Sequence, residues 1–161
     1  MRGDCGEHVC RGGLFLFDHD RHSNPSRVYS IDVNPAAVHF MRENIRINEA
    51  YGVVVPMLGD AKKVVEERLR GIADRVLMPL PEKAFEYIPH VLLAIKRTGG
   101  LVHYYDFEHA KKGENSVEKV RAKVTKRFES LGVAFDFSFG RVVRPTGSNW
   151  YHVVLDISIT H

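Results

Sequence analysis

The chain has 161 residues, of which 44% are hydrophobic and 27% are charged, and its net charge is +3. This length supports one domain with a buried core. No apolar run approaches the roughly 20 residues that a membrane-spanning helix needs. The first residues, with Arg2, Asp4 and Glu7, lack the pattern of a secretory signal peptide. We therefore expect a cytoplasmic protein with no membrane partner, and the small positive charge indicates an anionic partner only weakly.

Residues 1–26 do not follow the pattern of the rest of the chain, and we expect an atypical N-terminal segment there, followed by one domain at 27–161. The segment holds both cysteines, Cys5 and Cys10, with His8 between them and His19 and His22 nearby. Their spacing fits no common set of zinc ligands. We therefore expect no metal, and no disulfide either, in a chain with the composition of an intracellular protein.

From residue 27 onward, apolar strands and amphipathic helices alternate regularly. Strands are expected at 28–32, 53–58, 75–78 and 101–105, helices at 35–48, 61–70 and 82–97, a helix capped by Ser116 that ends near 131, and strands near 133–143 and 151–159. Helical crossovers imply a parallel sheet, and the short polar link 145–149 implies an antiparallel pair. The pattern predicts an α/β fold with a Rossmann-like sheet, mostly parallel with an antiparallel C-terminal strand pair, as in class I methyltransferases.

Asp32 ends the first of these strands, and a helix begins directly after it with Asn34 as N-cap and Pro35 in the first turn. Open α/β folds hold the ribose of a nucleotide-like ligand at such a position. An aspartate that only caps a turn explains the segment equally well. Asp60 follows the next strand in the same way, and it too could simply be a helix N-cap.

Basic residues crowd the helix after Ser116, and two more follow in the next strand: Lys119, Arg121, Lys123, Lys126, Arg127, Arg141 and Arg144. A solvated helix face and a surface that contacts phosphates both explain the cluster. In the strand before this helix, His103, Tyr104 and Tyr105 are consecutive. Alternate members are expected in the core, and the other side of the strand could stack on a base.

Six pieces of the chain, in this order, resemble the catalytic domain of the archaeal tRNA (guanine-N1)-methyltransferases: Val28–Pro35, Glu43–Asn48, Gly59–Ala61, Asp74–Pro81, Gly100–Phe107, and Val143-Arg144 with Tyr151–Asp156. The related aminocarboxypropyltransferase of wybutosine synthesis contains the same domain. The resemblance implies transfer of a methyl group from S-adenosylmethionine to N1 of the guanosine 3′ of the anticodon in tRNA. Aminocarboxypropyl transfer to the same base and a non-catalytic tRNA-binding remnant are the alternatives.

The resemblance also implies roles for individual residues. Asp32 would accept hydrogen bonds from the ribose hydroxyls of the cofactor, and Asp60, with Ala61 beside it, would accept from the amino group of adenine. Val33 would also belong to the cofactor site. The turn Pro79-Leu80-Pro81 would line the catalytic pocket beside the reacting methyl group and the target base, although the family usually has Asn where Pro79 stands.

Among the basic residues, Arg144, Lys123 and Arg127 would contact tRNA.

N1 of guanine carries a proton, so the reaction needs a base. The family's glutamate has no counterpart here, and Asp106 is the only local substitute.

The family's first strand and glycine loop are missing from residues 1–22. Read one base out of frame, one permitted choice of codons for Gly3 to Leu14 spells Glu-Ile-Val-Val-Asn-Met-Phe-Ala-Gly-Val-Gly, which is close to that missing loop. We therefore hypothesise a frame slip over residues 1–22. Leu14–Phe17 could take the place of the lost strand, but without the glycines the backbone cannot approach a cofactor closely. We expect weak cofactor binding, or none.

Overall fold

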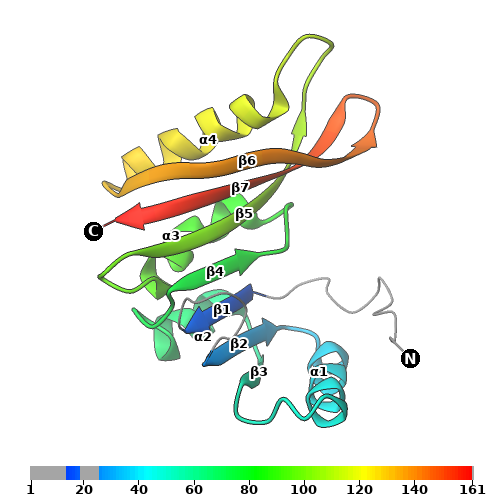
Figure 1. The fold of residues 1–161 in the computed structure, drawn as a ribbon, viewed down its shortest axis with the longest axis vertical. Helices are drawn as coiled ribbons and strands as arrows, with labels where there is room; N and C mark the ends of the chain where they lie inside the picture. Colours follow the sequence, from blue (N-terminus) through cyan, green and yellow to red (C-terminus); the bar gives the residue numbers. More distant parts are fainter. Residues whose placement is uncertain (1–13, 19–25, 161) are drawn as a thin grey trace.

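The computed structural model describes residues 14–18 and 26–160, with backbone only for 14–18. The expectations for Cys5, Cys10 and the nearby histidines lie outside these residues. The strands are β1 (Leu14–Asp18), β2 (Arg27–Asp32), β3 (Val54–Leu58), β4 (Arg75–Met78), β5 (Gly100–His109), β6 (Ala134–Gly147) and β7 (Trp150–Thr160). They form one sheet in the order β3-β2-β1-β4-β5-β7-β6 (Figure 1).

The helices are α1 (Pro35–Ile47), α2 (Ala61–Arg68), α3 (Ala84–Ala94) and α4 (Ser116–Ser130). Asn34 caps α1 as expected, because its side chain accepts a hydrogen bond from the Ala36 amide at 2.9 Å. The cap of α4 is Asn115 and not Ser116, since the Asn115 side chain accepts from the Val117 and Glu118 amides. Within the part of the chain that the structure describes, no helix is long and apolar enough to cross a membrane.

The sheet is mixed, which corrects the expectation of a mostly parallel one. Parallel pairing occurs between β2 and β3 and between β4 and β5, while β1 is antiparallel to both of its neighbours. The eight residues between β1 and β2 are too few for the helical crossover that a parallel connection needs. β1 therefore fills the central place expected for Leu14–Phe17, but in the reverse direction. The antiparallel C-terminal pair is present as β6 and β7.

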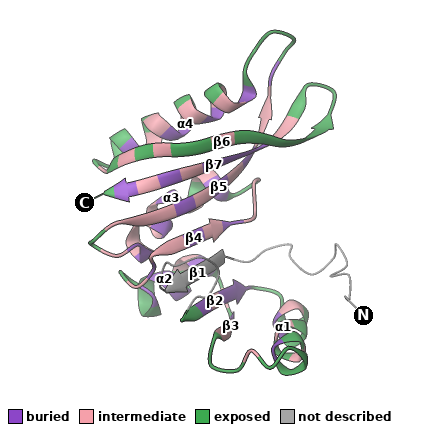
Figure 2. Cartoon of the chain, viewed as in Figure 1, coloured by how far each residue is buried: buried purple, intermediate pink, exposed green. Residues whose placement is uncertain are grey.

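The helices lie on two sides of this sheet. The main hydrophobic core joins buried side chains of α2, α3 and α4 to Ile31, Val76, Val102 and Leu155 of the strands. On the other side, α1 packs on β2 and β3, where the Ser30 hydroxyl donates to the Met41 sulfur at 3.2 Å. Buried positions therefore concentrate in the middle strands and on the inner sides of the helices (Figure 2).

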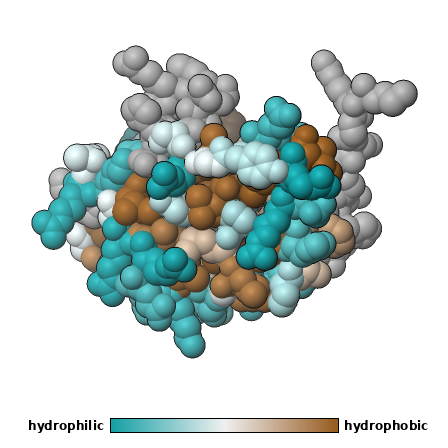
Figure 3. All heavy atoms as spheres, turned by 90° about the horizontal axis from the view of Figure 1, so that it is seen from below, coloured by the Kyte–Doolittle hydropathy of each residue, from teal (hydrophilic) through white to brown (hydrophobic). Residues whose placement is uncertain are grey.

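The β3 end of the sheet carries exposed apolar side chains among charged ones (Figure 3). Those that are more than a third exposed are Val33, Phe40, Ile47, Tyr51, Val53 and Leu58. Val33 directly follows β2, and Leu58 ends β3. Both therefore lie where the parallel strands end, next to the candidate site.

Candidate functional site

The predicted site residues gather at one edge of the sheet, where β2, β3 and β4 end. Asp32 is level with Leu58 in the parallel register of β2 and β3, and Asp60 follows two residues later. Pro79-Leu80-Pro81 follows β4, on the other side of β1. The chain order of the strands reverses between β1 and β4, and α/β sheets bind ligands beside such a reversal, at the carboxyl ends of the strands.

Asp32 is buried, with only 2% of its surface exposed. Its Oδ1 accepts a hydrogen bond from the Asn34 amide at 2.8 Å, and its carbonyl oxygen accepts from the Gly59 amide at 3.0 Å. The turn-capping role considered from the sequence is therefore present. The second carboxylate oxygen still has acceptor capacity for a ligand.

Asp60 is exposed, and its Oδ1 accepts from the Lys62 amide at 2.8 Å as the N-cap of α2. Ala61 beside it is buried at 7% exposure. Val33 follows Asp32, and Leu58, two residues before Asp60, is level with Asp32. These two apolar residues are 61% and 53% exposed. This edge thus offers acceptor oxygens next to open apolar surface, a combination that suits a ligand with hydroxyl and amino groups around a flat apolar ring.

The turn Pro79-Leu80-Pro81 is half-buried between β4 and α3. The Leu80 carbonyl accepts from the Lys83 amide at 3.2 Å, which closes the turn before α3 begins. Prolines fix the backbone of this turn but provide no amide donor. Position 79 therefore cannot supply the side-chain amide that the family pattern has there.

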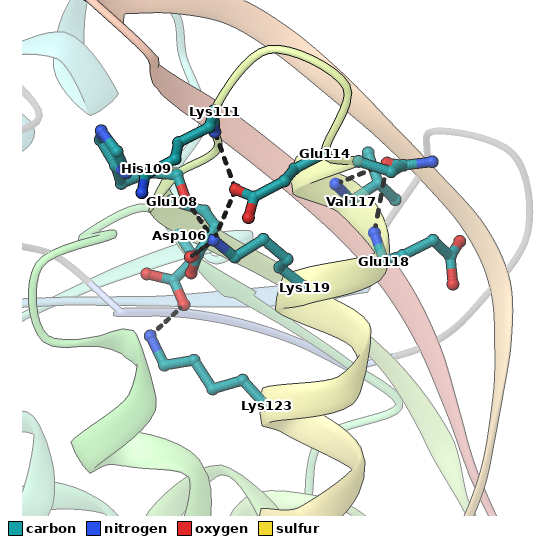
Figure 4. A network of polar contacts seen from close by, with 10 residues as sticks. Asp106, Glu108, His109, Lys111, Glu114, Val117, Glu118, Lys119 and Lys123 are labelled. Atoms are coloured by element: carbon teal, nitrogen blue, oxygen red, sulfur yellow. Dashed lines mark hydrogen bonds and ion pairs between the residues drawn. The ribbon is translucent and has the colours of Figure 1, made fainter.

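Asp106 lies inside β5, which continues to His109 because it pairs with β7 along its whole length. Asp106 is 4% exposed, and its Oδ2 accepts from the Tyr104 hydroxyl at 2.8 Å. The same oxygen accepts from Lys123 Nζ at 2.7 Å, the contact that Figure 4 shows. Burial raises the pKa of Tyr104 above its ordinary range, and the charge of Asp106 raises it further. This carboxylate is the shared acceptor of a buried hydrogen-bond cluster. The geometry gives no support to its use as the catalytic base.

Lys123 and Arg127 lie together on the inner side of α4. Besides its ion pair with Asp106, Lys123 Nζ is 5.2 Å from the centre of the Phe85 ring, and the Arg127 guanidinium is 5.8 Å from the same ring. Both side chains are half-buried. These contacts connect α4 to α3. The spacing of apolar residues in α4 did not predict them.

Arg144 is exposed on β6, opposite His152 of β7. The structure therefore does not bring it together with Lys123 and Arg127. Tyr105, Phe107 and His109 of β5 lie on the same side of the sheet as His152, where rings of the two strands contact one another. The consecutive His103, Tyr104 and Tyr105 were the only sequence signal for this surface.

A separate cavity of about 390 Å³ is lined by Arg70, Gly71, Leu92, Leu93, Ile95 and Arg97. It lies near the amino ends of β4 and β5, and so it is at the edge opposite Asp32 and Asp60. In residues 26–160, no group of three or more His, Asp or Glu side chains is placed to hold a metal ion.

The strand order and the helices on both sides of the sheet define a Rossmann-like α/β domain. The comparison with known families agrees with this class: residues 11–133 match the TRM5/TYW2 methyltransferase domain. The chain therefore belongs to this family.

Among curated relatives, the chain is 38% identical over 133 residues to the tRNA 4-demethylwyosine(37)-methyltransferase Taw21 of Saccharolobus solfataricus, covering 83% of this chain and 45% of the relative. It is 31% identical over 136 residues to the tRNA (guanine(37)-N(1))-methyltransferase Trm5b of Pyrococcus abyssi, covering 83% and 37%. The chain thus spans less than half the length of either relative.

Among solved structures, TYW2 of M. jannaschii in complex with AdoMet superimposes with a TM-score of 0.73 at 28% identity, covering 85% of this chain and 59% of that one. The match extends over most of the described residues, so the Rossmann-like fold expected from the sequence is confirmed, apart from the mixed pairing of its strands.

Proposed function

We propose that this domain binds S-adenosylmethionine at the carboxyl edge of the sheet and transfers its methyl group to N1 of the guanosine 3′ of the anticodon in tRNA. The observation that carries the proposal is the pair of acids, Asp32 and Asp60, at the ends of two neighbouring parallel strands in a chain of the TRM5/TYW2 family. We expect the reaction to take place in the cytoplasm.

The chemistry of these side chains fits the cofactor. The free oxygen of Asp32 would accept from ribose hydroxyls, and that of Asp60 would accept from the adenine amino group. Val33, Leu58 and Ala61 would contact the adenine ring. When bound, S-adenosylmethionine supplies a methyl group already activated by its sulfonium, so the protein mainly has to align the target base and exclude water.

The fixed turn Pro79-Leu80-Pro81 would form the wall beside that base. It stands next to the reversal point of the sheet, and its two prolines limit its movement. Methyl transfer to tRNA is supported by the names of Taw21 and Trm5b, which are both tRNA methyltransferases acting at position 37.

Aminocarboxypropyl transfer from the same cofactor is the second candidate. The tRNA(Phe) (4-demethylwyosine(37)-C(7)) aminocarboxypropyltransferase of Methanocaldococcus jannaschii is 29% identical over 145 residues, covering 89% of this chain. Pro79 also favours this candidate, because it lacks the amide that the guanine-N1 pattern has at that place. The third candidate is a tRNA-binding domain without catalysis. The burial of Asp32 favours it, because a carboxylate that is closed to the cofactor cannot bind the ribose.

Calorimetric titration with S-adenosylmethionine tests the cofactor site. We expect weak but measurable binding that Asp32→Asn weakens by about tenfold or more, since a hydrogen bond to a charged group contributes about 1.5–3 kcal/mol. Asp136→Asn, at an exposed position of β6, is the matched control and should change nothing. Equal affinities for the wild type and Asp32→Asn would contradict the site.

The reaction is then identified with tRNA and doubly labelled cofactor. Methyl label in the tRNA supports methyl transfer, and label from the methionine chain supports the aminocarboxypropyl alternative. If no heat of cofactor binding is measured while salt-sensitive tRNA binding is retained, the non-catalytic alternative is correct.

A further inference from the structure

One side of the sheet over β5 and β7 is lined by aromatic side chains. Val102 and Tyr104 of β5, and Val153 and Leu155 of β7, point into the core that α3 and α4 cover. The alternate residues therefore point to the opposite side. Of the helices in the described part of the chain, α1 is the one on that side, and it packs on β2 and β3. The stretch over β5 and β7 thus lies away from it.

Five rings lie on this surface, in two groups of rings that contact one another. The ring of His152 is 5.5 Å from that of Tyr105 and 5.1 Å from that of Phe107, and the ring of His109 is 5.4 Å from that of Trp150. Trp150 is 47% exposed, and the other four rings are half-buried. We call these five residues together with Arg144 the aromatic face.

The aromatic face is cationic. Arg144 is exposed and lies opposite His152 in the register of β6 and β7, and Arg141, also exposed, lies opposite Val154 on the same side. Two acids share this side of β6 and β7. Asp156 is already paired with His103, whose Nδ1 is 2.6 Å from its Oδ1, and Asp136 lies opposite Ser158, six residues along β7 from His152. In the described part of the chain, Nε2 of His152 is buried without a hydrogen-bond partner. Within residues 26–160, neither Arg141 nor Arg144 forms an ion pair. The surface thus combines flat rings with guanidinium groups that can bind phosphates.

We propose that the aromatic face binds single-stranded RNA, with bases stacked on Tyr105, Phe107 and Trp150 and phosphates held by Arg141 and Arg144. Sheet surfaces that combine exposed rings with basic side chains bind unpaired nucleotides, since every base has a flat face to stack. A duplex keeps its bases stacked internally and would gain only the phosphate contacts.

The position of the aromatic face relates it to the candidate catalytic turn. Met78, the last residue of β4, is level with Tyr104, so Tyr105 lies one residue beyond the end of β4 and on the same edge as Pro79-Leu80-Pro81. The face would hold nucleotides that flank the base being modified. In naming the tRNA substrate as the source of that strand, the inference rests on the proposed function, whereas the binding itself does not require the cofactor.

Trp150 is the single tryptophan of the chain, so its fluorescence reports on this surface directly. The full chain would be titrated, without cofactor, with a single-stranded RNA of about ten nucleotides. We expect saturable quenching. Tyr105→Ala and Phe107→Ala should each weaken binding by about tenfold, and Tyr105→Phe should restore it, because stacking needs only the ring.

The phosphate contacts are tested by the dependence of the binding constant on salt. Arg144→Ala should lower the slope of log K against log salt by about 0.7, the value for one phosphate contact to a single strand. The matched controls are Tyr51→Ala, at a position 65% exposed beyond α1, and Arg68→Ala in α2, and neither should change affinity or slope. Circular dichroism excludes variants that fail to fold.

Equal affinity for a duplex of the same sequence, or equal binding by Tyr105→Ala and Tyr105→Phe, would overturn the proposal. So would a change in Trp150 emission with protein concentration alone together with self-association in sedimentation, because the face would then bind a second copy of the chain. RNA binding that persists while no cofactor binds leaves this inference intact and counts against the proposed transfer reaction. The reverse result counts against the aromatic face alone.

Discussion

Asp32 and Asp106 are both buried acids near the carboxyl edge of the sheet, but their partners differ. The described hydrogen bond of the Asp32 carboxylate is to a backbone amide and involves one oxygen, which leaves the other oxygen able to accept from a ligand. Asp106 is held by a hydroxyl and an ammonium group on a single oxygen. The two residues are of the same type, so the type alone does not tell their roles apart. The hydrogen-bond partners do: they leave Asp32 able to bind a ligand and give Asp106 a structural role.

The first prediction concerns the stability that Asp106 provides. Asp106→Ala leaves the Tyr104 hydroxyl and Lys123 without their acceptor, and we expect the free energy of unfolding to fall by about 2 kcal/mol. Urea denaturation measures the change. Glu114→Ala is the control, because Glu114 is exposed and its ion pair with Lys119 lies in solvent, where such pairs stabilise little. A smaller loss for Asp106→Ala than for Glu114→Ala would contradict the structural role.

The second prediction concerns pH. Burial lowers the pKa of His152 below its ordinary value, and the nearby charge of Arg144 lowers it further. The folded protein keeps this ring neutral, while the unfolded chain takes up a proton once the pH falls below about 6.5. The stability that the neutral His152 ring contributes is therefore fully present above that pH. It is lost as the pH falls through the lower pKa that this ring has in the folded protein.

Denaturation at pH 7.5 and 5.5 should accordingly show that the wild type loses more stability on acidification than His152→Gln does. His39→Gln, which changes an exposed histidine of α1, should behave like the wild type. Identical pH dependence for all three proteins would mean that the His152 environment is not as described.

At the scale of elements, local patterns were sufficient for nearly every helix and strand. The apolar spacing and the N-caps located α1 and α2 to within two residues at each end. The ends that differed depend on contacts remote in sequence. β5 continues to His109 because β7 pairs with it. α3 ends at Ala94, because Ile95 is extended and forms a parallel bridge with Ala73.

The candidate site was predictable to a similar degree. The acids and the proline turn follow strands, so their common edge was expected from chain order alone. The inner position of Lys123 and Arg127 was not, because it depends on Phe85 of a different helix. A basic residue near a helix surface gives no local sign of whether its charge meets solvent or another element.

The third prediction tests how closely α4 packs on the sheet. A Cβ added at Gly140 of β6 would lie 2.8 Å from Cδ2 of the buried Leu155 and 3.1 Å from Cγ1 of Val117. Gly140→Ala should therefore push α4 from the sheet and cost about 1–3 kcal/mol in thermal or chemical unfolding. In the same strand, a Cβ at Gly147 meets Trp150 at an ordinary 3.8 Å, so Gly147→Ala serves as the control. Equal stability of the two variants would argue against this close packing.

At the scale of the molecule, the direction of β1 is the main departure from a regular doubly wound sheet. Its neighbours β2 and β4 both end at the site edge, whereas the antiparallel β1 ends at the opposite edge. In parallel sheets of this order the central strand ends at the ligand edge, whereas β1 ends with Asp18 level with Arg27, at the start of β2. The frame slip hypothesised for residues 1–22 would produce this arrangement, because a short hairpin-length connection would replace the strand, glycine loop and crossover.

The fourth prediction follows from that hypothesis. A gene in which one base is inserted or removed, so that the segment before Leu14 spells Asn-Met-Phe-Ala-Gly-Val-Gly and rejoins the present frame near Arg21 to Asn24, should encode a chain that binds S-adenosylmethionine at least about tenfold more tightly in calorimetry. The glycines would let the backbone approach the cofactor closely. Replacing both glycines of the restored loop by alanine should abolish the gain. If genomic sequencing finds no slip within these codons, or if the corrected chain binds no better than the present one, the reversed β1 belongs to the native fold and the frame hypothesis is wrong.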